Sequence, residues 1–144
     1  LTLSGTKDQS DGLVYVHLDH SGGFLASGFY GVESQPLRAL RTRIVDESVE
    51  FLRIVKRLSK LGFEFDTAYH LKRMPRGFEA HADEPIADLL RLKSFVVRQP
   101  LHRSDWLDGS VTSKIVRMNK ASTELTLFGI ETFRAAVKSK RKGV

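Results

Sequence analysis

Cysteine is absent from this chain of 144 residues, and its absence removes several kinds of chemistry at once. Disulfide bonds, thiolate metal sites and cysteine nucleophiles are excluded, and such a composition suits a reducing compartment. Long apolar runs are also missing, so we predict no membrane-spanning segment and no membrane partner. We expect no signal peptide and a cytoplasmic location.

An excess of acidic residues is likewise missing. The chain has 23 Lys and Arg residues against 17 Asp and Glu residues, a formal net charge of +6. Four of the cations lie in residues 138–144, which contain no acid. We therefore expect a single, nearly balanced domain over residues 1–137 and a frayed basic tail over residues 138–144. Such a tail either binds polyanions loosely or serves only solubility.

The common catalytic and phosphate-binding motifs are missing as well. The chain contains no G-x-x-x-x-G-K-[ST], G-x-G-x-x-G, G-x-S-x-G or H-E-x-x-H pattern. His17 and His20 flank Asp19, but strand alternation points residues 17 and 20 to opposite faces. We interpret them as packing and solvent-facing residues, and we predict no metal site and no cofactor.

Alternating apolar side chains predict two strands in the first quarter of the chain, over residues 12–19 and 24–32. The turn signal at residues 20–23 makes them an antiparallel hairpin. A third strand is predicted over residues 94–99, and residues 1–11 are expected to be irregular. Gly28, inside the second strand, indicates a bulge or a close backbone approach.

Helical spacing predicts one helix from Ser34 and a second from residues 46–48. Residues 63–80 are interpreted as irregular, and a short helix is expected after Asp83. From Ser104 onward we expect two helices or one kinked helix, because glycines interrupt the pattern.

This order of elements predicts an α+β fold. Its antiparallel sheet combines the N-terminal hairpin with a later strand and is packed with four to five helices.

The densest group of cations predicts a binding site for an anionic ligand or polyanion. Lys72, Arg73 and Arg76 surround Pro75 in a Pro-Gly loop, and Lys93 follows the next predicted helix. Guanidinium and ammonium groups suit phosphate or carboxylate. The alternative is structural, with these cations paired to nearby acids or to a helix end.

Two further groups of residues are candidates. Tyr30 leaves the second strand near the start of the first helix, where Arg41 and the helix N–H groups offer an anion site. Cross-strand packing is the alternative role for Tyr30. His70 and His81 flank the basic loop and are candidate catalytic acid/base residues.

The stretch LKRMPRGFEAHADEPIADLLRLKSF, residues 71–95, resembles the signature of the family called domain of unknown function 2461. The matching positions are Leu71, Lys72, Arg73, Pro75, Gly77, Phe78, Leu89, Leu90, Lys93 and Phe95. Upstream segments around Tyr15–His17 and Gly23–Arg41 also resemble the family, so the resemblance covers roughly residues 12–101.

The resemblance implies a soluble, cytoplasmic α+β domain and brings no reaction with it. It also marks Lys72, Arg73, Arg76 and Lys93 as positions of the family pattern. Such proteins usually begin with a further helical segment, and the resemblance leads us to expect that this chain begins after it. The resemblance therefore leaves open whether the domain over residues 1–137 lacks that N-terminal family segment or the chain is a fragment.

Three functions remain open. The first is a module that binds an anionic small molecule or nucleic acid, although Phe78 is the only aromatic residue within the basic loop. The second is an enzyme for a phosphorylated or carboxylated small molecule, with His70 or His81 as acid/base, so enzymatic activity is undecided. The third is a structural or interaction domain of a larger protein, which predicts an exposed apolar patch.

Overall fold

A five-stranded antiparallel sheet organises the computed structural model, which describes residues 2–3 and 13–143. The strands are β1 (Thr2–Leu3), β2 (Leu13–His17), β3 (Phe24–Phe29), β4 (Glu64–Phe65) and β5 (Phe95–Pro100). They lie in the order β1-β2-β3-β5-β4, so β3 is central and β5 returns beside it. The predicted α+β class is confirmed, with the hairpin and the later strand in one sheet.

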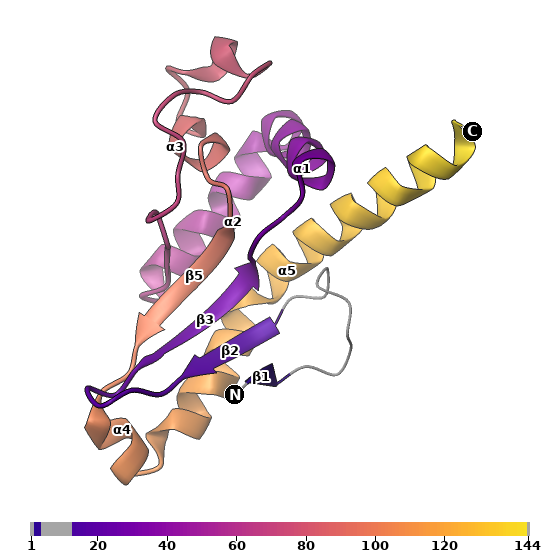
Figure 1. The fold of residues 1–144 in the computed structure, drawn as a ribbon. Helices are drawn as coiled ribbons and strands as arrows, with labels where there is room; N and C mark the ends of the chain where they lie inside the picture. The colour runs from indigo at the N-terminus through magenta and orange to yellow at the C-terminus, as the bar shows by residue number, and fades with distance from the viewer. Residues whose placement is uncertain (1, 4–12, 144) are drawn as a thin grey trace.

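The helices gather on one side of this sheet. They are α1 (Ser34–Asp46), α2 (Ser48–Lys60), α3 (Ala87–Leu90), α4 (Arg103–Leu107) and α5 (Ser110–Lys142), with a 3₁₀ helix, η1, at Glu79–His81. In Figure 1, α2 and α5 pass behind the sheet, α1 lies beyond the end of β3, and the other face of the sheet is turned to the viewer. In the described ranges, no helix has both the length and the apolar character needed to cross a bilayer.

Two glycines make the β2–β3 hairpin possible. Gly22 and Gly23 have φ angles of 130° and 100°, which L side chains rarely adopt. A Cβ on Gly23 would lie 1.8 Å from the carbonyl oxygen of His17. The hairpin register then pairs His17 with Phe24, which places both side chains on the same face.

Backbone packing also requires glycine inside β3. A Cβ on Gly28 would lie 1.9 Å from the carbonyl oxygen of Phe95, so the close approach predicted at this position is confirmed. Strand β4 was not predicted, since it falls within residues 63–80, which were interpreted as irregular. Two residues are too few to produce an alternating pattern. Strand β4 forms because the edge of β5 is available to pair with it.

Helix α5 lies directly across the core face of β3. The Ser27 hydroxyl donates a hydrogen bond to the hydroxyl of Ser122 over 2.9 Å, and both side chains are buried. The ring of Phe29 packs against Gly129, where a Cβ would lie only 2.1 Å from a ring carbon. Around this contact the core contains Val14, Val16, Leu25, Leu40, Ile44, Phe51, Ile54, Leu58, Phe95, Val97, Met118, Leu125, Phe128 and Phe133.

The structure corrects several helix boundaries. The short helix begins at Ala87 rather than directly after Asp83, and η1 precedes it. The C-terminal region breaks at Gly109, where φ is 77°, but α5 continues through Gly129. Gly129 does not break the helix because it serves a packing contact.

The ends of the chain also differ from expectation. The tail is helical as far as Lys142 rather than frayed, since Lys and Arg favour helix and complement its C-terminal dipole. Thr2 and Leu3 form a strand with β2, and the rest of residues 1–11 lies outside the described ranges.

Asp105 joins the last two helices. Its carboxylate accepts the N–H of His102 over 2.8 Å and the hydroxyl of Ser110 over 2.9 Å, and it pairs with Lys114 over 2.7 Å. The Lys114 contact, followed by the His102 N–H, lowers the pKa of Asp105 to about 2. The ionised carboxylate therefore stabilises the folded state above its unfolded pKa.

Replacing Gly129 with alanine tests the packing of α5. In a helix interior this change alone would be favourable by about 1 kcal/mol. Because the new methyl group meets Phe29, we expect Gly129→Ala to lower the free energy of unfolding by about 1–3 kcal/mol, measured by urea denaturation. Adding Phe29→Leu should recover part of the loss; purely additive losses would contradict the proposed contact.

Asp105 gives a pH-dependent prediction. Since its folded pKa is depressed, its contribution is present above about pH 4 and is lost as the pH falls toward 2. Asp105→Asn should therefore be less stable than the wild type at neutral pH, and the difference should shrink across this acidic range. Chemical denaturation at a series of pH values checks this, with the exposed Asp83→Asn as the control for loss of one charge. A difference independent of pH would show that the ionised carboxylate is not responsible.

Candidate functional site

The open face of the sheet carries a cavity of about 570 Å³. It is lined by Tyr15, Phe24, Ala26, Ser27, Gly28, Tyr30, Asp66, Tyr69, Ser94, Val96 and Arg98. These residues come from β2, from β3 and the residue after it, from β5 and the residue before it, and from the segment that follows β4. Its volume is within the range of small-molecule sites, and its lining is apolar with a few polar groups, as such sites usually are.

Aromatic rings form a continuous platform beside this cavity. The ring centroids of His17 and Phe24 are 4.9 Å apart, and those of Tyr15 and Phe24 are 6.0 Å apart. The guanidinium carbon of Arg98 lies 3.8 Å from the centroid of Phe24. The hairpin register brings the rings together, because residues 15, 17 and 24 share one face. His17 therefore packs, as predicted, and in the described part of the chain no three metal-ligating side chains cluster.

One ion pair lies among the lining residues. Arg98 pairs with Asp66 over 2.9 Å, so the two charges offset each other. The N–H of Ala68, which donates to Asp66 over 3.0 Å, holds the pKa of this carboxyl below its usual range, and Arg98 lowers it further. The pair therefore offers both a hydrogen-bond acceptor and donors to a ligand at neutral pH.

A single antiparallel register connects the cavity to the basic loop. It begins where Glu64 pairs with Arg98, continues through the hydrogen bond from the Asp66 N–H to the Val96 carbonyl, and reaches the bridge between His70 and Leu92. In this register the position of Tyr69 faces that of Lys93. The chain that lines the cavity therefore leads directly into the loop.

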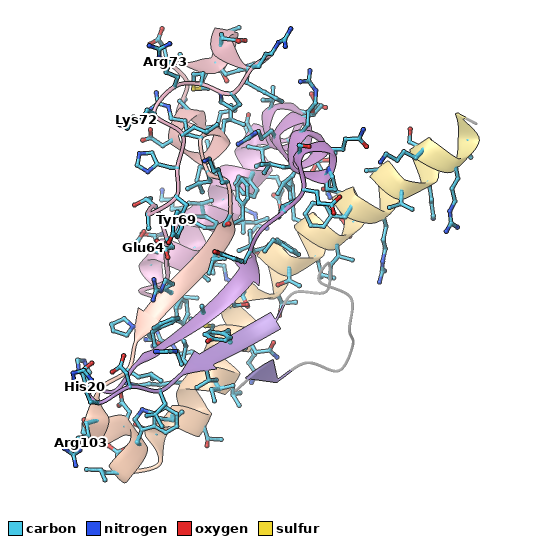
Figure 2. The ribbon with its side chains drawn as sticks, viewed as in Figure 1. His20, Glu64, Tyr69, Lys72, Arg73 and Arg103 are labelled. Carbon is cyan, nitrogen blue, oxygen red and sulfur yellow. The ribbon has the colours of Figure 1, made fainter. Side chains whose placement is uncertain are left out.

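Exposed cations follow at once along that loop. The side chains of Lys72, Arg73, Arg76 and Lys93 are exposed and have no hydrogen-bond or ion-pair partner among the described residues. Figure 2 shows Tyr69, Lys72 and Arg73 in succession along one edge, at the end of the molecule opposite Arg103.

Nearby acids do not neutralise these cations. Glu84 contacts His81 over 2.9 Å, Asp88 pairs with Arg91 over 3.2 Å, and Glu79 accepts the N–H of Gly77 over 2.8 Å. The structural alternative, in which local acids serve as partners of the loop cations, is therefore not realised by these three carboxylates.

The loop is held by buried residues beneath its charges. Pro75 and Phe78 are buried, and the Phe78 N–H donates to the Pro75 carbonyl over 3.0 Å. The guanidinium of Arg38 donates to the Arg76 carbonyl over 3.4 Å and lies over the Phe78 ring. The cations at positions 72, 73 and 76 are therefore displayed by an anchored backbone.

The second predicted group separates into two environments. Tyr30 lines the cavity and is 74% exposed, so it is not a cross-strand packing residue. Arg41 is buried and donates to the carbonyl oxygens of Leu90 and Leu92 over 2.7 Å and 2.9 Å. Burial lowers the pKa of this guanidinium, which nevertheless joins α1 to the end of the loop region.

The two candidate histidines have different local partners. His70 Nδ1 contacts the carbonyl oxygen of Thr67 over 2.5 Å, and His81 contacts Glu84. Neither histidine is among the residues that line the cavity.

A shallower hollow of about 340 Å³ lies between α2 and α5. Two of its cations already have partners, since Arg57 pairs with Glu124 and Arg117 donates to the Leu61 carbonyl. It is a weaker candidate than the sheet cavity.

Sequence reasoning missed most of the residues that line the cavity. Tyr15, Asp66, Tyr69 and Arg98 come from separate elements, and only the pairing of β5 with β3 and β4 brings them together. The alternating pattern was the one available signal, because it places Tyr15 and His17 on one face.

Fold and cavity together define an α+β protein whose antiparallel sheet is covered by helices on one face and carries an aromatic cavity on the other. The chain belongs to the family described as conserved hypothetical protein (DUF2461), whose model matches residues 2–128. The family resemblance is thereby confirmed and extends beyond the range expected from the motifs. No curated protein and no solved structure matches the chain.

Arg41 provides a test that separates folding from binding. Arg41→Met removes both donations and leaves the carbonyls of Leu90 and Leu92 unpaired. We expect the free energy of unfolding to fall by about 2 kcal/mol in urea denaturation. Arg134→Met, at an exposed position of α5, is the control and should change it by less than about 0.5 kcal/mol. Unchanged stability in Arg41→Met would argue that these hydrogen bonds do not support the fold.

Proposed function

We propose that this protein binds an anionic ligand or polyanion through Lys72, Arg73, Arg76 and Lys93. The observation that supports the proposal is that all four side chains are exposed and lack partners among the described residues. Three acids of the same segment, Glu79, Glu84 and Asp88, contact other groups. Clustered cations repel one another in water, and an anion relieves that repulsion. We also propose that the protein acts in the cytoplasm, as expected from the sequence.

The anchored loop backbone favours binding. Buried Pro75 and Phe78 and the carbonyl contacts of Arg41 hold the region in place before a ligand arrives. Preorganisation of this kind reduces the conformational entropy lost on binding. Arginine forks at positions 73 and 76 suit the oxygens of phosphate, and lysine adds compact charge.

Binding is better supported than catalysis by a histidine. An acid/base enzyme requires His70 or His81 beside both the cations and a concave site. The contacts of these histidines with Thr67 and Glu84 do not supply that arrangement. The cavity itself has no imidazole in its lining.

A base-free polyanion tests this proposal. We would measure binding of a fluorescent abasic oligonucleotide by anisotropy at several salt concentrations. The double variant Lys72→Glu with Arg73→Glu should weaken binding roughly tenfold or more at low salt. Neutralising the same two residues with glutamine should flatten the slope of log K against log salt by about 0.7 for each lost phosphate contact.

Two control variants match that charge change. Lys56→Glu with Arg103→Glu replaces one lysine and one arginine at exposed positions outside the loop. Lys140→Glu with Arg141→Glu tests the basic end of α5. If either control weakened binding as much as the loop variant, attraction to net charge would explain the result and the loop proposal would fail.

A further inference from the structure

Every tyrosine of the chain lies in the sheet cavity. The sequence contains three, and Tyr15, Tyr30 and Tyr69 all line it. They are 39%, 74% and 67% exposed, so Tyr30 and Tyr69 lie largely in water and Tyr15 partly so. Large rings exposed around one cavity are characteristic of a binding surface rather than of a folded core.

We infer that this cavity binds a nucleobase, so that the ligand is a nucleotide unit with its base on the open sheet face and its phosphate at the loop cations. This inference rests on the proposed function, because it assigns the anion to the same loop. It adds a second site and a ligand class.

Stacking is the first argument for a base. Antiparallel sheets that bind single-stranded nucleic acid present aromatic side chains on an uncovered face, where bases stack on them. Here the platform of Tyr15, His17 and Phe24 occupies such a face, and Tyr30 and Tyr69 line the adjoining cavity. The half-exposed guanidinium of Arg98, which already lies over Phe24, adds a planar cation on which a base can stack.

Hydrogen-bonding groups are the second argument. The Asp66 carboxylate accepts, the Arg98 guanidinium donates, and the Ser94 hydroxyl, which accepts the Gly31 N–H over 3.3 Å, still has a proton to donate. The edges of a nucleobase carry both donors and acceptors. A purely apolar ligand would cover these groups without using their remaining hydrogen-bonding capacity, at a loss in affinity.

Charge placement is the third argument. Lys93 directly precedes Ser94 and, in the antiparallel register, faces Tyr69, and both of those neighbours line the cavity. Lys72 and Arg73 continue along the same edge in Figure 2. A ligand with a planar ring joined to an anionic group therefore matches this site, because the aromatic cavity and the loop cations lie next to each other along one edge.

The central experiment compares two strands that differ only in their bases. The wild type should bind a short oligodeoxythymidylate roughly tenfold or more tightly than an abasic strand of the same length, because each stacked base adds to affinity. In Tyr30→Leu with Tyr69→Leu the preference should fall to about twofold or less. Tyr30→Phe with Tyr69→Phe should keep most of it, since the rings remain.

Controls separate the base site from the phosphate site. Leu18→Ala and Leu107→Ala remove exposed apolar side chains that do not line the cavity and should leave the preference unchanged. Lys72→Glu with Arg73→Glu should lower the affinity for both oligonucleotides by a similar factor. Tyrosine emission should be quenched by the base-containing strand and not by the abasic one, with Trp106, which is not in the lining, as the reference.

Free nucleotides show whether the natural ligand is a mononucleotide or single-stranded nucleic acid, which share the same base and phosphate groups. Adenosine, cytidine, guanosine and uridine monophosphates that quench the tyrosines and compete with the strand would identify a nucleotide site. Competition only by strands would identify single-stranded nucleic acid. Both results support the inference.

Three results would overturn it. Equal affinity for the two strands, with the loop still required, would leave the proposed function in place and point to a peptide or a second copy of the chain on the open face. A base preference that survives loss of both tyrosines would place the base elsewhere. Failure of both strands and all the nucleotides to bind would remove the inference and the proposed function together.

Discussion

The contact between α5 and β3 decides which side of the sheet is buried. The ring of Phe29 occupies the space that a side chain at Gly129 would take, and the hydroxyls of Ser27 and Ser122 meet beside it. Because side chains alternate along a strand, burial of Leu25, Ser27 and Phe29 sends Phe24 and Ala26 to the other face. The open aromatic face is therefore a direct consequence of how closely the helix approaches.

Strand β5 extends this arrangement toward the basic loop. Its core-side residues Phe95 and Val97 are buried, while Val96 and Arg98 line the cavity. The segment after β4 runs beside it, pairs with it again at the bridge between His70 and Leu92, and brings Asp66 and Tyr69 to the cavity edge. The same pairing thus organises both the aromatic cavity and the approach to Lys72.

In the loop region, the residues that hold the backbone in place differ from those that present charge to solvent. Arg41 directs its guanidinium inward to the carbonyls of Leu90 and Leu92, and Pro75 and Phe78 are buried under the loop. Arg73 and Arg76, a few positions away in sequence, project into solvent. The family pattern across residues 71–95 contains both kinds of position, so a folding requirement and a binding surface share one motif.

Local pattern in the sequence determined the hairpin, the positions of α1 and α2, and the α+β class, because alternation, helical spacing and turn glycines act over short distances. It also pointed to the exposed cations at positions 72, 73, 76 and 93. It did not reveal that Arg41 is buried, that Gly129 lies within a continuous helix, or that Tyr15, Tyr30 and Tyr69 share a cavity. Those features depend on which strands pair and which helix covers them. Contacts between segments that are distant in the sequence produce no periodic pattern of residues, so local analysis does not find them.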